Sequence, residues 1–522
     1  MRVLVAEPLS DEGLRLLEAE HQVDVRTELP RAELLAALAD YEALLVRSQV
    51  KVDAEAFAAA GRLLVVGRAG VGVDNIDLEA ATRAGVTVVN APTANTIAAA
   101  EHTLALLYAL ARRVPAADAS VRRGEWQRAR FMGQELRGRV LGIVGLGRIG
   151  LTIAERARAM EMELLGHDPF VTDEAAAAHG VRLMPLQELL RRADAITLHV
   201  PLTHATRGLI GSDELALMKP TAVLVNVARG GVVDETALAA ALVAGRLAGA
   251  AVDVFEHEPP TGSPLLEAPN TVLTPHLGAS TEEAQARVAV ETVQQVLDVL
   301  AGRSARYAVN APLVPAETAD ALAPYLPLAR ALGMFYAQFA RSLEGLTLEL
   351  AGEVAEYDSA PIVAAALSGL LELAAEGRVN LVNAPLLARE RGLVLAERRT
   401  EESPRFQSLI TISGEAAGAT VAGTVSGGEQ RLVRLGDYWV DMPPAPWMLV
   451  THHQDRPGTM GRIGLMLGEA DVNISAMHLG RATPRGDALM ILALDEAVPD
   501  EVAERIRRHE AVIDTWLIKL AG

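Results

Sequence analysis

Three short segments carry side chains that could together perform acid–base chemistry on a carbon–oxygen bond. Each ends an apolar run of strand length, and they hold Arg229, Glu258 and His276. Histidine titrates near neutrality and suits the exchange of a hydroxyl proton. A neighbouring carboxylate stabilises its imidazolium form, and an arginine fork binds a substrate carboxylate. The set predicts hydride transfer at a carbinol carbon. Spacing does not choose between Glu258 and Glu256, and a structural role for each residue stays open.

A glycine-rich turn indicates the cofactor that such chemistry needs. Gly145, Gly147 and Gly150 form the pattern G-x-G-x-x-G between a predicted strand and a predicted helix. These glycines permit a tight turn and close approach to a pyrophosphate, which the helix N-terminus stabilises. Asp168 ends the next predicted strand, where a carboxylate accepts hydrogen bonds from ribose hydroxyls and repels a 2′-phosphate. The motif predicts NAD rather than NADP, with a structural glycine turn as the alternative.

Two α/β units must position these motifs. In the first ninety residues, apolar runs of strand length alternate with Ala/Leu/Glu-rich segments, which is typical of a parallel sheet covered on both faces. A helical stretch from Ile97 to about Gly124, broken near Pro115, leads into a second series of the same kind. A helix at about 282–301 can return the chain to the first unit. Because ligands bind at the carboxyl ends of such strands, we expect the strand-end residues to converge.

The character of the sequence changes after Asn310. Four prolines between 312 and 327 indicate a linker that merges into a helix, and mixed strands and helices follow to about Tyr438. A second proline-rich break at 442–447 precedes a tail with the predicted order βαββαβ.

The expected fold class is therefore α/β, with one doubly wound parallel-sheet domain inserted in another, then an α+β domain and a βαββαβ domain. The predicted boundaries are a substrate-binding domain of 1–96 and 282–306, a nucleotide-binding Rossmann domain of 97–281, an intervening domain of 307–442, and a regulatory domain of 447–522.

The composition excludes several classes of function. The 522 residues carry a net charge of −19, so we expect neither nucleic-acid nor membrane-surface binding. Cysteine is absent, which excludes disulfides, thiolate metal sites and a cysteine nucleophile, and we expect no metal. No apolar stretch reaches the ~20 residues of a membrane span, and the N-terminus lacks the features of a signal peptide. A cytoplasmic location is expected.

Six segments within residues 1–306 resemble the D-isomer-specific 2-hydroxyacid dehydrogenase family, in the family's order. They are VGRAGVGVDNID (66–77), NAPTANTIAAAEHTLAL (90–106), GLGRIG (145–150), NVARGG (226–231), DVFEHEP (253–259) and PHLGAST (275–281). The resemblance implies that His276 is the acid/base, that Glu258 is its partner and that Arg229 binds the substrate. The family's acid directly precedes a proline, which favours Glu258 over Glu256.

The same resemblance implies the cofactor and substrate contacts. Backbone N–H groups around Gly70 and Gly72 would meet the substrate carboxylate. The implied contacts to NAD lie in the glycine-rich loop and at strand ends. They are Val71, Gly145, Gly147, Arg148, Ile149, Gly150, Asp168, Val200, Val227, Ala228, Arg229, Asp253, His276, Leu277, Gly278 and Ala279.

The tail narrows the resemblance. Its segments DRPG (455–458) and DVNIS (471–475) resemble an ACT domain, a small-molecule regulatory module. A 2-hydroxyacid dehydrogenase, an α+β insertion and a terminal ACT domain together resemble the long-form D-3-phosphoglycerate dehydrogenases. That subgroup implies oxidation of 3-phospho-D-glycerate to 3-phosphohydroxypyruvate with NAD, the first step of L-serine biosynthesis, in a homodimer or homotetramer.

A phosphorylated substrate needs cations, and here these are arginines because the chain has only three lysines. Arg47, Arg68 and Arg130 stand in the segments that most resemble the phosphoglycerate enzymes. The family suggests that Arg130 acts across a dimer interface. An ordinary surface or ion-pair role is the alternative for each.

The ACT-like tail implies an L-serine effector. Asp455 and Asn473 could hold the ammonium and carboxylate ends of an amino acid, whereas His453 stands where some serine-regulated relatives carry an aromatic residue. The alternative is an ACT domain that serves only as an oligomerisation surface.

Two other functions compete with this interpretation. Another member of the family, such as a hydroxypyruvate or glyoxylate reductase, would act on unphosphorylated acids. An NAD-sensing corepressor of the same fold would bind the cofactor to control assembly, but the acidic charge and the ACT-like tail argue against it.

Overall fold

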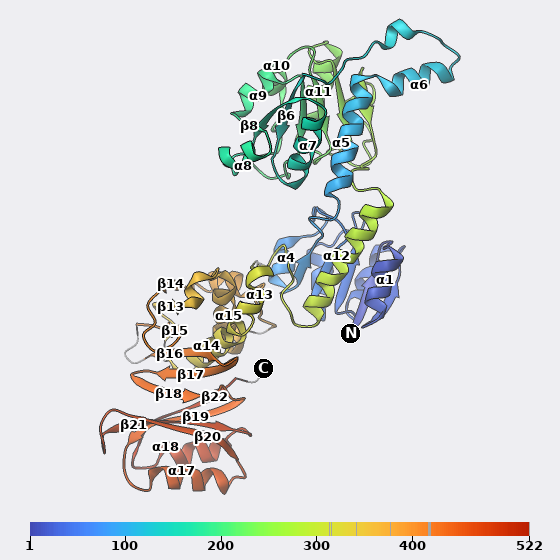
Figure 1. Ribbon diagram of the computed structural model, residues 1–522. Coiled ribbons are helices and arrows are strands. Elements are labelled where there is room, and N and C mark those ends of the chain that lie inside the picture. Colours follow the sequence, from blue (N-terminus) through green and yellow to red (C-terminus); the bar gives the residue numbers. More distant parts are fainter. Residues whose placement is uncertain (313, 315, 341, 376, 416–418, 521–522) are drawn as a thin grey trace.

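Four β-sheets organise the computed structural model, which describes residues 1–312, 314, 316–340, 342–375, 377–415 and 419–520 (Figure 1). Two sheets are parallel, one is mixed and one is antiparallel. The predicted fold class is therefore confirmed.

The first sheet has five parallel strands in the order β2-β1-β3-β4-β5. Ser10, Asp53 and Asp77 begin three of its helices, because each side chain accepts a hydrogen bond from the first turn. The elements are β1 (Arg2–Val5), α1 (Asp11–Glu18), β2 (Gln22–Val25), α2 (Arg31–Leu38), β3 (Ala43–Val46), α3 (Ala54–Ala59), β4 (Val65–Arg68), α4 (Leu78–Arg83) and β5 (Thr87–Val89).

The second sheet has seven parallel strands in the order β12-β11-β10-β9-β6-β7-β8. The strand order reverses between β6 and β9, and this is where such sheets bind ligands. The elements are α5 (Thr96–Ala111), β6 (Val140–Val144), α7 (Arg148–Ala159), β7 (Glu163–His167), α8 (Asp173–Ala178), β8 (Arg182–Leu183), α9 (Leu186–Arg192), β9 (Ala195–Leu198), α10 (Ser212–Leu217), β10 (Val223–Asn226), α11 (Glu235–Val243), β11 (Gly249–Val252), the 3-10 turn η2 (Pro264–Leu266) and β12 (Thr271–Leu273).

Two helices connect these sheets. The chain passes from the first to the second along α5 and returns along α12 (Glu282–Leu300), as Figure 1 shows. The apolar face of α12 is buried in the core of the first sheet, where Val293 and Val296 join Val3 and Val5. The predicted return helix is therefore present, and it places the carboxyl ends of both sheets toward a common cleft.

An arm leaves the second unit between α5 and β6 (Figure 1). It contains α6 (Val114–Arg122) and the 3-10 turn η1 (Arg128–Phe131). The predicted break near Pro115 is confirmed, because Arg113 adopts a left-handed backbone and Pro115 lies in the first turn of α6. Trp126 and Met132 on this arm are 76% and 77% exposed, which is unusual for large apolar side chains.

The third sheet is mixed, with the order β14-β13-β15-β16-β17-β18. Helices begin within the segment expected to be a linker, because Pro324 and Pro327 fall at the start of α14, where no intrahelical N–H donor is needed. The elements are α13 (Ala316–Leu322), α14 (Tyr325–Phe339), β13 (Leu346–Gly352), η3 (Glu353–Glu356), α15 (Ala360–Leu371), η4 (Glu372–Ala374), α16 (Ala384–Glu390), β14 (Leu395–Thr400), β15 (Ser408–Ser413), β16 (Thr420–Ser426), β17 (Glu429–Leu435) and β18 (Tyr438–Met442).

The tail has the predicted βαββαβ order and an antiparallel sheet, β20-β21-β19-β22. One face of this sheet shares a hydrophobic core with the third region, and the Phe339 and Trp516 rings lie 4.9 Å apart. The elements are β19 (Trp447–Gln454), α17 (Thr459–Gly468), β20 (Ile474–Arg481), β21 (Asp487–Leu494), α18 (Asp500–Arg507) and β22 (Val512–Lys519). Among the described residues, no helix combines the length and apolarity needed to cross a membrane.

Candidate active site

His276 and Glu258 form a hydrogen-bonded pair at the carboxyl edge of the second sheet. His276 follows β12, and its Nδ1 lies 2.9 Å and 3.1 Å from the two oxygens of Glu258. The backbone N–H of Phe255 donates to the same carboxylate. Glu256 instead lies near Arg207. Of the two glutamates that the sequence spacing left open, Glu258 is the one that contacts His276. With Nδ1 engaged, Nε2 of His276 is left to exchange a proton with a ligand.

The charge state of Glu258 follows from these contacts. Partial burial raises the pKa of the carboxyl, but the hydrogen bond and charge of His276 outweigh it and hold the pKa below its ordinary value. Glu258 is therefore ionised at neutral pH and stabilises a protonated His276.

A second carboxylate supports the loop that carries His276. Asp253, which has 0% exposure, accepts hydrogen bonds from the backbone N–H groups of Leu277 and Gly278 and from the Thr274 hydroxyl. His102 on α5 also contacts it, at 3.1 Å. Burial raises the pKa of Asp253, but these hydrogen bonds hold it below its ordinary value. These hydrogen bonds to Asp253 hold the loop that carries His276 in place. A direct contact between Asp253 and the cofactor stays a prediction.

Three arginines line the cavity next to this pair. The cavity measures about 800 Å³, and Arg47, Arg68 and Arg229 share it with Glu258 and His276. Within the described part of the chain, neither Arg47 nor Arg68 forms an ion pair, and the Nε of Arg68 is buried without a hydrogen-bond partner. Burial, with the nearby charge of Arg229, lowers the pKa of Arg68 to about 10. This guanidinium is still charged at neutral pH, so the cavity attracts anions.

Two glycines let the backbone lie against these guanidinium groups. A Cβ atom at Gly70 would overlap Arg68, and one at Gly72 would overlap Arg229. Asp74, from the same loop, lies 3.3 Å from Nε of Arg229, an ion pair that the sequence did not reveal. The loop thus packs its backbone against two guanidinium groups of the cavity, and Arg229 beside Gly72 can bind a carboxylate together with nearby peptide N–H groups.

The glycine-rich loop fits a dinucleotide pyrophosphate. Gly145 has a φ of 93°, and a Cβ there would lie 2.6 Å from the carbonyl oxygen of His199. A Cβ at Gly150 would overlap the Gly145 carbonyl. Gly147 caps α7 without a side chain, and nothing lies within 4 Å of the position of its Cβ. The free N–H groups of the first turn therefore face open space, where an anion can approach.

Asp168 lies at the end of β7, beside this loop. Its Oδ2 accepts a hydrogen bond from the N–H of Leu146 and its Oδ1 one from the N–H of Phe170, both at 2.9 Å. The carboxylate is therefore fixed and partly exposed where a ribose would lie. Arg148 reaches from α7 to the carbonyl of Pro92 in the connection between the units.

The remaining predicted cofactor residues lie at the carboxyl edge of the second sheet or across the cleft from it. Val200 follows β9, Val227 and Ala228 follow β10, and a Cβ at Gly278 would contact the Val227 side chain at 3.1 Å. Val71 and Ala279 line the cavity itself, Leu277 follows His276, and Ile149 lies in the first turn of α7. The contacts of these residues with NAD stay predictions.

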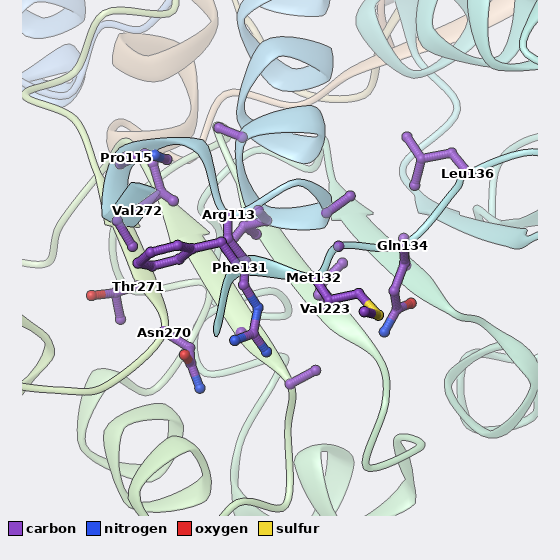
Figure 2. Close-up of a pocket in the computed structure, with 18 of the residues that line it drawn as sticks. Arg113, Pro115, Phe131, Met132, Gln134, Leu136, Val223, Asn270, Thr271 and Val272 are labelled. Carbon is purple, nitrogen blue, oxygen red and sulfur yellow. The ribbon is translucent and has the colours of Figure 1, made fainter. Parts of the chain in front are cut away.

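Arg130 does not join the other arginines within one chain. It lies in η1 and lines a separate cavity of about 220 Å³ with Phe131 and Asn270 (Figure 2). This cavity is formed by the amino ends of strands β9 to β12, at the sheet edge opposite His276.

The predicted effector residues lie apart in the tail. Asp455 follows β19, where it forms an ion pair with Arg481 at 2.7 Å. Asn473 precedes β20 and donates a hydrogen bond to Asp495 at 2.6 Å. Arg481 lies eight residues after Asn473, at the far end of β20, so Asp455 beside it is about 26 Å from Asn473 along the strand. Within one chain the two residues therefore do not meet, and their role in binding an effector stays a prediction. His453 is buried on β19, the strand that pairs with β21 on one side and β22 on the other.

Comparisons with protein families cover most of the chain. Residues 104–278 match the NAD binding domain of the D-isomer specific 2-hydroxyacid dehydrogenases. Residues 321–436 match the D-3-phosphoglycerate dehydrogenase intervening domain, and residues 447–511 match the ACT domain.

Individual relatives and solved structures agree. The chain is 44% identical to the D-3-phosphoglycerate dehydrogenase of Synechocystis sp., over 99% of this chain and 95% of that protein. It is 43% identical to that of Methanocaldococcus jannaschii, over the full length of both. The TT0316 protein of Thermus thermophilus superposes with a TM-score of 0.55 at 40% identity, over 59% of this chain and 100% of that one. A D-lactate dehydrogenase of Aquifex aeolicus, complexed with NAD and lactic acid, gives a TM-score of 0.52 at 28% identity, over 58% and 96%.

The full-length matches, the intervening domain and the ACT domain occur together with the His276–Glu258 pair and the glycine-rich loop. The chain belongs to the family of the D-3-phosphoglycerate dehydrogenases.

Proposed function

We propose that the chain oxidises 3-phospho-D-glycerate to 3-phosphohydroxypyruvate with NAD, the reaction that begins L-serine biosynthesis. The observation that carries this proposal is a single cavity with an acid–base pair and three guanidinium groups. The substrate carries a carboxylate and a phosphate, and the cavity offers separate cations for the two. The full-length relatives are D-3-phosphoglycerate dehydrogenases, which supports the same reaction.

Each side chain of the site has a separate role in the proposed reaction. Arg229 binds the substrate carboxylate with the backbone of the Gly70–Gly72 loop, which fixes the neighbouring hydroxyl carbon. Nε2 of His276 accepts the hydroxyl proton, while Glu258 stabilises the imidazolium that results. NAD, when bound, supplies the acceptor for the hydride that leaves the same carbon. The glycine-rich loop and Asp168 would hold its pyrophosphate and ribose.

The phosphate assignment rests on Arg47 and Arg68. Neither forms an ion pair among the described residues, and the burial of Arg68 without such a partner is unfavourable unless a ligand compensates it. A dianionic phosphate is the matching group. Arg130 can contribute only if the arm of a second copy brings it to the cavity, which agrees with a homodimer or homotetramer. The exposed Trp126 and Met132 on the arm favour such a contact.

Regulation by L-serine requires a second copy in the same way. His453, Asp455 and Asn473 cannot meet within one tail, so an effector site would form where Asp455 of one copy faces Asn473 of another. We also propose the domain division 1–96 with 282–306, 97–281, 307–442 and 447–522, with the ACT-like tail as the regulatory unit.

The direct test is NADH formation from NAD and 3-phosphoglycerate by the purified protein. We expect turnover, and in the reverse direction NADH consumption with 3-phosphohydroxypyruvate. A protein that turns over hydroxypyruvate or glyoxylate but neither phosphorylated substrate would instead be a reductase of the wider family.

A further inference from the structure

A buried carboxylate lies beneath the cavity and outside the catalytic set. Glu7 lies two residues after the end of β1, and it is 5% exposed. Its Oε2 accepts hydrogen bonds from the backbone N–H groups of Arg47 at 2.6 Å and Val50 at 3.1 Å, and its Oε1 accepts one from Gln49 at 3.0 Å. One side chain thus satisfies three donors of the 47–50 loop, which follows β3.

The same loop is held from its other side. The Asn75 amide donates to the carbonyl of Arg47 at 2.9 Å and to that of Val50 at 2.7 Å. Glu7 therefore binds the donors of this loop and Asn75 its acceptors. The backbone from which the Arg47 side chain enters the cavity is fixed at both ends by groups distant in sequence.

The charge of Glu7 has a second consequence. Glu7 forms no ion pair among the described residues, although a neutral acceptor would suffice to bind backbone N–H groups. The residues after it, Pro8 to Ser10, line the cavity, so its charge lies under the cavity wall. There it opposes, as Asp74 also does, the lowering of the Arg68 pKa by burial. A carboxylate at this place therefore favours the charged form of Arg68.

We propose that Glu7 is a positioning residue for the phosphate group of the substrate: it orders the 47–50 loop and so presents Arg47 to the cavity beside Arg68. The proposal rests on the proposed function, since it assumes that these two arginines meet the phosphate. It assigns no chemical step to Glu7, which acts through the loop.

The sheet offers a matched control. Glu42 is also a buried carboxylate, 8% exposed, and it also accepts a backbone hydrogen bond, from Arg2 at 2.7 Å. It directly precedes β3, whereas the 47–50 loop follows β3, so the two carboxylates lie at opposite edges of the same sheet. Loss of a buried carboxylate should destabilise the fold in both variants, but only Glu7 is connected to the cavity.

The experiment compares Glu7→Gln and Glu42→Gln in the full-length protein. We measure kcat and KM for 3-phosphoglycerate, KM for D-glycerate as an unphosphorylated substrate, KM for NAD, and Tm. For Glu7→Gln we expect KM for 3-phosphoglycerate to rise about tenfold or more, because the loss of charge-assisted hydrogen bonds changes affinity by that order. Its kcat should stay within about threefold, and KM for D-glycerate and for NAD should change little. Glu42→Gln should lower Tm without this selective change, and Glu7→Asp should restore part of the affinity.

Three outcomes overturn the proposal. A KM for 3-phosphoglycerate that is equally raised in both glutamine variants indicates general destabilisation. Equal increases for the phosphorylated and unphosphorylated substrates place the effect outside the phosphate site. An unchanged KM for 3-phosphoglycerate in Arg47→Ala would show that Arg47, through which Glu7 would act, does not bind the substrate. If Glu7→Gln does not fold, Asn75→Ala releases the loop from its other side, and an unchanged KM in that variant also contradicts the proposal. A wild-type protein without activity on 3-phosphoglycerate contradicts the proposed function instead.

Discussion

The cleft and the tail both hold residues expected to bind small molecules, but they differ in whether the polar and charged side chains already have partners. In the cleft, Arg47 and Arg68 have no carboxylate partner within the described residues, and Arg229 has only the exposed Asp74. In the tail, Asp455 is already paired with Arg481, and Asn473 with Asp495. The cleft residues line one cavity, whereas the tail residues lie about 26 Å apart.

This difference indicates how many copies each function needs. One chain brings the His276–Glu258 pair and the three arginines to one cavity, so most of the proposed catalytic machinery needs no second copy. In the described tail, Asp455 and Asn473 already have partners and lie apart, so the proposed effector site would need contact between copies. Four predictions test this contrast.

The largest effect is expected at His276. In His276→Ala we expect kcat to fall by about 100-fold to 10,000-fold, because general acid–base catalysis contributes that much, while NAD affinity is retained. Steady-state NADH formation and NAD titration measure the two. His204→Ala, in an exposed loop, is the control. Loss of NAD affinity and of Tm together with activity would make His276 a structural residue.

The next effect concerns the charge of Arg68. Because burial lowers its pKa to about 10, the guanidinium is charged below that pH and loses its proton as the pH rises through it. The KM for 3-phosphoglycerate should therefore rise above pH about 10. The same measurement on Arg68→Ala should show a KM raised by about tenfold or more at neutral pH, without that alkaline increase. An identical alkaline profile in the variant refutes the assignment to Arg68.

A smaller effect is expected from Asp168→Ala. Removing the carboxylate removes repulsion of a 2′-phosphate and an acceptor for the ribose, so the ratio of kcat/KM with NAD to that with NADP should fall by about tenfold. Asp173→Ala, in the exposed first turn of α8, serves as the control. If the ratio is unchanged, another group selects the cofactor.

The smallest effect tests the tail. L-serine at millimolar concentration should inhibit the wild-type protein, and Asn473→Ala should abolish this inhibition. Because we propose a site shared between copies, inhibition should also weaken on dilution as the assembly dissociates. Initial rates at several protein concentrations, with sedimentation at the same concentrations, measure both. Serine that binds a monomer, or does not bind at all, contradicts the proposal that the effector site is shared between copies.

The sequence predicted the parts of the site that depend on local pattern. The glycine-rich turn, the strand before it and Asp168 lie within 30 residues of one another, so their periodicity and spacing define them. The βαββαβ tail was predictable for the same reason. Strand β8, of two residues, is too short to give a period.

The contacts that the sequence did not reveal join distant segments. His102 and Asp253 are 151 residues apart. The sequence showed His102 only as a polar residue within an apolar helix. Asp74 and Arg229 meet because the two sheets face one cleft, which no local pattern specifies. Glu7 shows the same limit, since Arg47 is 40 residues away, beyond two helices and two strands.

The central claim is that the unpaired cations of the cleft recognise a phosphate group. Its most direct test is the ratio of kcat/KM for 3-phosphoglycerate to kcat/KM for D-glycerate, in the wild-type protein and in a variant with both Arg47→Ala and Arg68→Ala. We predict a strong preference of the wild-type protein for the phosphorylated substrate and the loss of most of that preference in the double variant. Equal use of both substrates by the wild-type protein, or an undiminished preference in the double variant, would contradict the claim.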